Sequence, residues 1–172
     1  AYINGRAGER FAVRNSGVHV VVEGIGDHGC EYMTGGRVVI LGDVGKNFGA
    51  GMSGGIAYVY AKDEEAFKDL CNQELIEFET VSSPAEQEEL KTLIQNHYRY
   101  TDSVKASCIL EDWAKCVRKF VKVIPKDYKR MITLIEEQKL QGLSEEEAVM
   151  SAFLANSGAT SKPSKQQEAA IR

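Results

Sequence analysis

Apolar and polar positions alternate in repeating blocks over the first third of the chain. Three apolar runs begin 19 residues apart, and each follows a turn-forming triplet that ends in glycine. Two short strands and their turns in one such block cannot bury a core alone, but they suit one coil of a stack in which each coil pairs with the next. The pattern therefore predicts a right-handed parallel β-helix. The blocks are Asn15-Ser16-Gly17 with 18–22, Thr34-Gly35-Gly36 with 37–41, and Ser53-Gly54-Gly55 with 56–60.

Stacking at this spacing places equivalent residues in columns. We expect Val21, Ile40 and Val59 to form an inward aliphatic ladder, and Gly17, Gly36 and Gly55 to adopt positive φ where each coil turns. The opposite columns, 20/39/58 and 22/41/60, are also apolar, so we expect a second layer to cover them. A shorter strand is predicted over 11–14, 30–33 and 49–52, and a polar corner ladder over Asn15, Thr34 and Ser53.

The same register, extended backwards, places Tyr2-Ile3 under Val21-Val22. Those first residues are predicted to be the last strand of an earlier coil. The sequence also begins without a methionine, so we expect it to be a fragment of a longer protein.

The second half has a different composition. Fourteen of the sixteen glycines precede residue 56, and Glu, Lys, Leu and Gln dominate after residue 62. Ser83 and Ser144 are each followed by a glutamate three residues later, which is the capping-box pattern at a helix start. We therefore predict a β-helix domain over 1–62, a mainly helical region over 63–156, and a disordered tail or linker over 157–172. The predicted helices cover 63–72, 84–98, 103–118, 126–141 and 144–156, with extended segments at 75–81 and 120–124.

Charge and cysteine content exclude several classes of function. A net charge of −4 argues against a nucleic-acid partner, and without a run of 18 apolar residues no membrane partner is expected. Cys30, Cys71, Cys108 and Cys116 are too widely spaced for zinc or iron–sulfur templates, so no metal site is predicted. Reduced, mostly buried thiols and the lack of a signal-peptide pattern favour a cytoplasmic protein.

The charges are also segregated along the chain. Residues 63–90 carry ten acids and one base, whereas residues 115–130 carry seven bases and one acid. Two interpretations remain open: solvated helix faces of opposite sign, or a basic stretch that docks on an acidic surface of a partner.

One glycine motif imitates a dinucleotide site. Gly24 to Gly29 fits GxGxxG after a predicted strand, but a cofactor site needs a helix to open at the third glycine, and the following residues do not favour one. His19, His28 and His97 lie in no catalytic motif; His19 is expected in a column with Val38 and Ala57, and His97 on the apolar face of a helix. We therefore predict no catalytic, cofactor-binding or metal-binding residue.

Two segments together carry a family resemblance. The stretch GIGDHGCEYMTGGRVVILGDVGKNFGAGMSGGIAYVY at 24–60 resembles the C-terminal GXGXG β-helix domain of glutamate synthase large subunits, and HYRYTDSVKASCILEDWAKCVRKFVKVIPKDYKRM at 97–131 resembles the helical tail of the same subunits. The resemblance covers about residues 1–135. It implies a structural domain that scaffolds an amidotransferase domain and an FMN and iron–sulfur synthase domain of the same chain.

The resemblance also implies the reaction of the parent enzyme, in which glutamine, 2-oxoglutarate and a reductant give two glutamates. FMN and a [3Fe-4S] cluster, with FAD and NAD(P)H or ferredoxin as the electron source, are implied for the parent and none for this segment. Contact with an electron-transfer small subunit is left open. Two alternatives also remain: a stand-alone GXGXG assembly module like a formylmethanofuran dehydrogenase subunit, and a carbohydrate-active β-helix, which the aliphatic outer columns disfavour.

Overall fold

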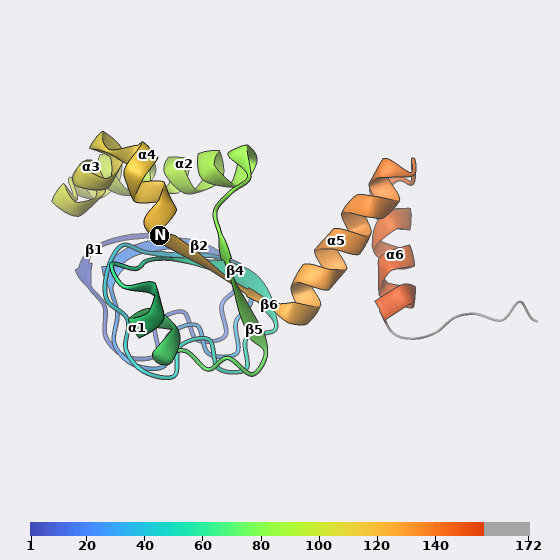
Figure 1. Ribbon diagram of the computed structural model, residues 1–172, viewed down its shortest axis with the longest axis horizontal. Helices are drawn as coiled ribbons and strands as arrows, with labels where there is room; N and C mark the ends of the chain where they lie inside the picture. The colour runs from blue at the N-terminus through green and yellow to red at the C-terminus, as the bar shows by residue number, and fades with distance from the viewer. Residues whose placement is uncertain (157–172) are drawn as a thin grey trace, which may run out of the picture. The chain divides into compact units, whose positions relative to one another are not determined.

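The computed structural model describes residues 1–156, which fall into two compact units, residues 1–128 and residues from 129 onward. The first unit is built on one six-stranded sheet with the order β1-β2-β3-β4-β6-β5. Its first four strands belong to a parallel solenoid, as Figure 1 shows. The strands are β1 (Tyr2–Arg6), β2 (Ser16–Gly24), β3 (Thr34–Ile40), β4 (Gly54–Tyr60), β5 (Ile76–Thr80) and β6 (Phe120–Pro125).

The predicted fold class is confirmed: the protein is mainly β with α, and coils of about 19 residues stack in parallel. Tyr2 pairs with Val21 and Ile3 with Val22, as the extended register predicted. The solenoid interior is filled by apolar side chains, so it is a closed core and no channel runs through it. Its buried members include Val22, Ile25, Met33, Ile40, Phe48, Met52 and Val59.

The predicted inward ladder is wrong by one residue in its first coil. The register partner of Ile40 is Val22, while Val21 pairs with Val39 and faces the opposite way. The cause is an irregularity between Ser16 and His19, where β2 holds one residue more than β3. One extra residue reverses every side chain beyond it, because side chains alternate with a period of two. Val20 therefore also faces inward, against the prediction.

The backbone of the corner glycine also differs between the first coil and the later two. Gly36 and Gly55 have positive φ, at 89° and 78°, as predicted. Gly17 does not, so that part of the prediction is wrong.

The return side of each coil was predicted as a short strand, and it is instead a turn. Residues on this side alternate between left-handed and ordinary backbone, so successive N–H groups do not form a strand ladder. They bond to neighbouring coils nonetheless: Arg14 N–H donates to Glu31 at 2.9 Å, and Tyr32 N–H to Ala50 at 2.9 Å. The left-handed residues are Arg10, Ala12 and Arg14, then His28, Cys30 and Tyr32, then Asn47, Gly49 and Gly51.

The solenoid is closed at β4 by segments from later in the chain. β6 pairs antiparallel with β4, and β5 pairs antiparallel with β6. On the return side, Phe48 forms a parallel bridge with Cys71, just after the short helix α1 (Glu64–Asp69). Phe48 and Phe67 pack edge to face at 5.7 Å, so α1 contributes to the coil core.

A helical layer covers the outer face of the sheet, as predicted (Figure 1). It consists of α2 (Pro84–Thr101), α3 (Val104–Glu111), α4 (Trp113–Cys116) and a 3₁₀ turn, η1 (Val117–Lys119). The single helix predicted over 103–118 is interrupted at Asp112, whose φ of −119° and ψ of 47° are not helical. Val39, Leu41 and Tyr58 pack under this layer together with Leu90, Ile94, Ile109 and Phe120.

The two predicted capping boxes have different outcomes. At Ser144 the box forms: its hydroxyl donates to Glu147 at 2.7 Å, and the Ser144 N–H donates to the same carboxylate at 3.0 Å. At Ser83 the prediction is wrong, because the Ser83 side chain makes no cap hydrogen bond. Glu86, the expected partner, accepts a hydrogen bond from Lys122 instead, since a charged ammonium is a stronger donor to a carboxylate than a backbone N–H.

The second unit contains most of α5 (Lys126–Leu140) and all of α6 (Glu145–Asn156), joined through Gly142 with φ 94°. Ala148 and Ala152 are its buried side chains among the described residues, while Phe153 and Met150 are more than half exposed. The tail predicted over 157–172 lies outside the described residues. The predicted domain limits at 62 and 156 stay predictions.

Candidate functional site

The GxGxxG loop is used to stack coils. Gly26 N–H donates to Gly8 and Gly45 N–H donates to Gly26, both at 3.0 Å, while His28 N–H donates to Lys46 at 2.8 Å. A Cβ at Gly29 would lie 2.3 Å from Ile25 Cδ1. These amides are bonded between coils, and the chain continues as a turn and not as a helix. The loop therefore lacks the free N–H groups at a helix N-terminus that bind a pyrophosphate.

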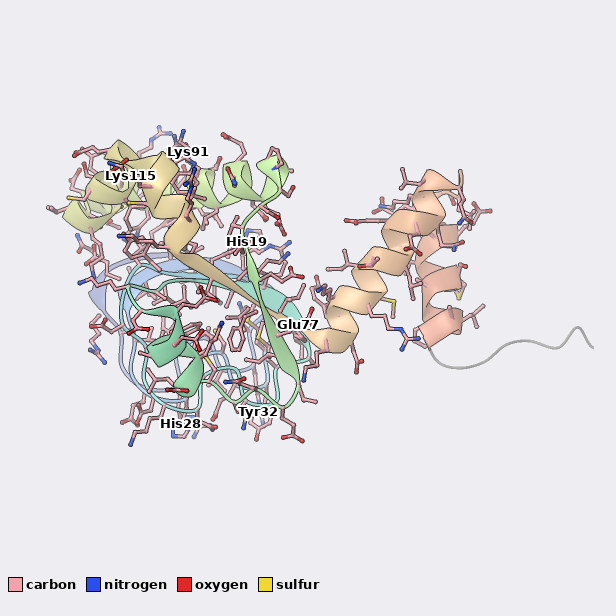
Figure 2. All side chains as sticks on the ribbon, in the orientation of Figure 1. His19, His28, Tyr32, Glu77, Lys91 and Lys115 are labelled. Atoms are coloured by element: carbon pink, nitrogen blue, oxygen red, sulfur yellow. The ribbon has the colours of Figure 1, made fainter. Side chains whose placement is uncertain are left out.

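The three histidines lie in three separate settings, and Figure 2 places His19 and His28 on different sides of the solenoid. His19 is exposed on β2 and pairs with Arg37 rather than with Val38, so its predicted column is wrong by the same one-residue shift. His97 is fully buried on the inner face of α2, as predicted.

His28 belongs to a polar ladder on the return side of the coils. Its Nδ1 lies 2.8 Å from the Glu31 carboxylate, which also accepts a hydrogen bond from Asn47 Nδ2 at 2.7 Å. Asn72 in turn donates to Asn47 at 3.4 Å. The imidazole–carboxylate pair could act as a base, but it contacts the Asn47 amide of the next coil, so the arrangement fastens the two coils together.

A charged network joins the sheet to the start of α2. Lys122 on β6 contacts Glu79 on β5 at 3.0 Å and also Glu86 on α2, and it is only 8% exposed. Burial alone would lower the pKa of Lys122, but hydrogen bonds to Glu86 and Glu79 outweigh it and raise that pKa. Nearby, Arg37 binds Glu89 of α2 at 3.1 Å. The segregated charge thus pairs at least partly within the chain, at the interface between layers.

Tyr58 lies beside this network, and its hydroxyl has no hydrogen-bond partner among the described residues. The side chain is fully buried on β4. Burial, reinforced by the Glu89 and Glu86 carboxylates, raises the pKa of Tyr58 well above its usual value, so the phenol stays neutral.

Two cavities open on either side of Tyr60, at the corner that follows β3 and β4. One, of about 320 Å³, is bounded by 42–44, 59–63 and three apolar or small residues of α1 and its end, Ala66, Phe67 and Leu70. The other, of about 230 Å³, extends to Lys105, Cys108, Ile109 and Cys116 of the helical layer. Their walls are mainly apolar, with Asp43 and Lys62 at the shared rim, and among the described residues they bring no histidine to a nucleophile.

The thiols do not fit an iron–sulfur cluster. Cys30 is buried in the coil core, where burial strongly raises its thiol pKa, and burial raises the pKa of Cys71 to about 12. Cluster ligands must ionise, so these two thiols are poorly suited to iron. Cys108 and Cys116 line a cavity in the helical layer, and within residues 1–156 no three His, Cys, Asp or Glu side chains gather as a metal site.

The sequence did not indicate which residues form the Lys122 network, nor that the Glu23 carboxylate lies beside the buried His97. The segregation of acids and bases along the chain was the signal for the Lys122 network, but it did not identify the residues that pair.

Among residues 1–156 no helix is long and apolar enough to cross a bilayer.

The geometry defines a class: a glycine-dependent parallel solenoid with a helical layer on its sheet face. The chain belongs to the GXGXG motif family, whose model matches residues 1–126. This confirms the resemblance drawn from residues 24–60 and 97–131.

The relatives that match the chain are glutamate synthases, in agreement with this family. The chain is 66% identical over 156 residues to the glutamate synthase [NADPH] large chain of Bacillus subtilis, covering 91% of this chain and 10% of that one. It is 55% identical over 132 residues to glutamate synthase [NADH] of Schizosaccharomyces pombe, covering 77% and 6%. It is 52% identical over 124 residues to the ferredoxin-dependent glutamate synthase of Pyropia yezoensis, covering 72% and 8%. The chain thus spans a tenth or less of these relatives.

Proposed function

We propose that this chain is the structural GXGXG segment of a glutamate synthase and carries no catalytic residue of its own. In this proposal it holds the amidotransferase domain and the FMN and iron–sulfur synthase domain in a fixed arrangement. The parent reaction converts glutamine, 2-oxoglutarate and a reductant into two glutamates. The partners are those two domains of the same longer chain, with the electron-transfer small subunit as a further candidate and the cytoplasm as the location.

The observation that carries the proposal is the identity of the relatives. Proteins named for NADPH, for NADH and for ferredoxin all match this segment at 52–66% identity. A segment shared among enzymes with three different electron donors serves a task that does not depend on the donor. A filled coil core and the inter-coil hydrogen bonds of the Ile25, Gly26 and His28 amides support a mechanical task as well.

The cofactors of the family do not fit the residues of this segment. The thiols that would bind a [3Fe-4S] cluster are buried or dispersed, and the GxGxxG amides are bonded between coils. FMN, the cluster, and any FAD or NAD(P)H site therefore belong, in this proposal, to other parts of the parent enzyme. The stand-alone GXGXG module is not favoured, because the relatives described above are glutamate synthases.

The test separates coupling from chemistry in the full-length synthase that contains this chain. Gly36→Val should strain the solenoid, since a side chain there would meet the Val18 carbonyl, whereas Gly17→Val places the same side chain where a Cβ has open space and serves as the matched control. We expect Gly36→Val to keep glutamine hydrolysis and ammonia-dependent glutamate synthesis, but to hydrolyse more glutamine per glutamate made. Loss of one half-reaction alone, with the fold intact, would place catalytic machinery in this segment and contradict the proposal.

A further inference from the structure

A single carboxylate joins three elements where the helical layer meets the first two strands. Glu23 lies at the end of β2, and its Oε2 accepts a hydrogen bond from the Gly5 N–H of β1 at 3.0 Å. Its Oε1 accepts a hydrogen bond from the hydroxyl of Ser103, the N-cap residue of α3. The Ser103 Oγ accepts from the Ala106 N–H at 3.1 Å. Glu23 therefore fastens β1 and β2 to the start of α3.

His97 of α2 faces the same carboxylate. The imidazole is fully buried, neither ring nitrogen has a hydrogen-bond partner among the described residues, and Nε2 lies 3.8 Å from Glu23 Oε1. A neutral ring tolerates this setting at the cost of an unsatisfied donor. A protonated ring would bring two donors and a positive charge into the same place.

The charged and titratable groups around His97 come from four elements. Glu23 on β2 favours its protonation, and Lys105 on α3, with Nζ held 3.0 Å from the Glu23 carbonyl, helps to keep the Glu23 carboxylate ionised. Arg6 of β1 binds the Ile25 carbonyl at 2.8 Å, and the Tyr2 ring of β1 lies 6.3 Å from the imidazole and stacks on Tyr100 of α2. Burial lowers the pKa of His97, and Glu23 only partly opposes this effect.

We propose that Glu23, His97 and Ser103 form a proton-sensitive latch that holds the α2–α3 corner on β1 and β2. An imidazolium seeks the acceptor that faces its Nε2, which is the Glu23 oxygen already bonded to Ser103. A carboxylate that moves to the imidazolium leaves the Ser103 hydroxyl and weakens the cap of α3. Protonation of His97 therefore loosens the corner.

Besides the apolar packing of α2 and α3 on the sheet and the Lys105 bond to the Glu23 carbonyl, two contacts with β1 hold this corner. Asn4 Nδ2 donates to the Thr101 carbonyl at 2.9 Å, and Tyr2 stacks on Tyr100 with ring centres 5.4 Å apart. Between the helices, Asp102 has a left-handed backbone with φ 51° and ends α2, its N–H donating to the Tyr98 carbonyl. Strands β3 and β4 lie deeper in the sheet and should not respond.

The experiment follows imidazole NMR signals and amide hydrogen exchange of the 172-residue chain between pH 8 and 4.5. We expect His97 to titrate below the ordinary value of about 6.5. As the pH falls from about 6.5 to the native pKa of His97, the protection of α2–α3 amides, corrected for intrinsic exchange, should fall by up to about tenfold per pH unit, the limit for one proton. Protection of β3–β4 amides should stay constant. His97→Leu should remove the pH dependence, whereas His19→Leu, at an exposed histidine, should leave it unchanged.

Glu23→Gln is the second variant and decides the matter if His97→Leu does not fold. It keeps the side-chain size but removes the charge that favours imidazolium, so the His97 titration should move to lower pH. The loss of α2–α3 protection should still begin near pH 6.5 but should continue to a lower pH than in the unmodified chain. The proposal is overturned if His97 titrates at or above about 6.5. It is equally overturned if the pH dependence persists in His97→Leu, or if the loss of protection in Glu23→Gln does not extend to lower pH.

Discussion

The two cores of residues 1–128 are built on different principles. Inside the coils the core is almost entirely aliphatic, aromatic and sulfur-containing, and inter-coil backbone hydrogen bonds already fix its geometry. Between the sheet and the helices, buried polar groups join the apolar ones: His97, Ser103, Lys122 and the Tyr58 hydroxyl. A helix on a sheet has no backbone ladder to orient it. We interpret the polar groups as the contacts that set the position of the helical layer, at some cost in stability.

The largest expected effect lies inside the coils. Phe48 is fully buried and packs against Phe67, and Phe48→Ala should destabilise the chain by about 3–5 kcal/mol, because a large cavity remains in a core that the coil backbone prevents from collapsing. Urea unfolding measures the effect. A cost below about 1 kcal/mol would show that the coil interior is more plastic than this comparison allows.

Removal of the buried cation should have a smaller effect at the interface. Lys122→Met leaves Glu79 and Glu86 facing each other without a positive charge, but both carboxylates are 26% exposed and partly hydrated. We expect a loss of about 1–3 kcal/mol in unfolding free energy. Adding Glu79→Gln and Glu86→Gln should recover most of it. An equally unstable triple variant would mean that the loss does not come from the two carboxylates left without their cation.

Backbone shape in the coils can be tested with a pair of glycines. Gly36 has φ 89°, and a Cβ there would lie 2.4 Å from the Val18 carbonyl, whereas Gly17 has an ordinary backbone with open space beside it. Gly36→Ala should cost about 1–3 kcal/mol through strain, and Gly17→Ala should change stability by less than about 0.5 kcal/mol. Thermal unfolding of the two variants side by side gives the answer. Equal costs would contradict the corner geometry.

The smallest effect, and the one of opposite sign, concerns Tyr58. Its hydroxyl is buried without a partner, so Tyr58→Phe removes a polar atom that gains nothing from folding. We expect the variant to be equally stable or more stable by up to about 1 kcal/mol. Calorimetry with Tyr60→Phe as the control separates the two sites, because the Tyr60 hydroxyl donates to Cys116 Sγ at 3.6 Å. A marked loss in Tyr58→Phe would show that the phenol has a bound water or other partner.

The sequence predicted the solenoid because a spacing of 19 residues survives in three coils and dictates parallel stacking. It did not predict the side-chain direction in the first coil, because one extra residue between Ser16 and His19 is invisible in a pattern of small and β-branched residues. Nor did it predict the left-handed return side, since the residue types there differ between coils: Arg, Ala and Arg, then His, Cys and Tyr, then Asn, Gly and Gly.

The contacts between the sheet and the helical layer were harder still to predict from the sequence. The local sequence around Glu86 predicted a capping box. Lys122, which binds Glu86 instead, reaches it because β6 returns to the sheet beside β4. Glu23 and Ser103 are 80 residues apart, and no local pattern relates residues at that distance. Contacts that depend on how helices pack on a sheet become visible only in the tertiary structure, whereas a sequence repeat defines the register of its own coils.

The antiparallel strand β6 gives the stack a direction. A parallel coil laid on β4 would need the edge that β6 occupies, and the bridge between Phe48 and Cys71 closes the return side of the same end. Duplication or deletion of a whole coil between β1 and β4 would leave this closure untouched, because each coil repeats the contacts of its neighbours. In evolutionary terms, such a protein can change its length by whole coils while the closed end and its helices are inherited as one fixed block.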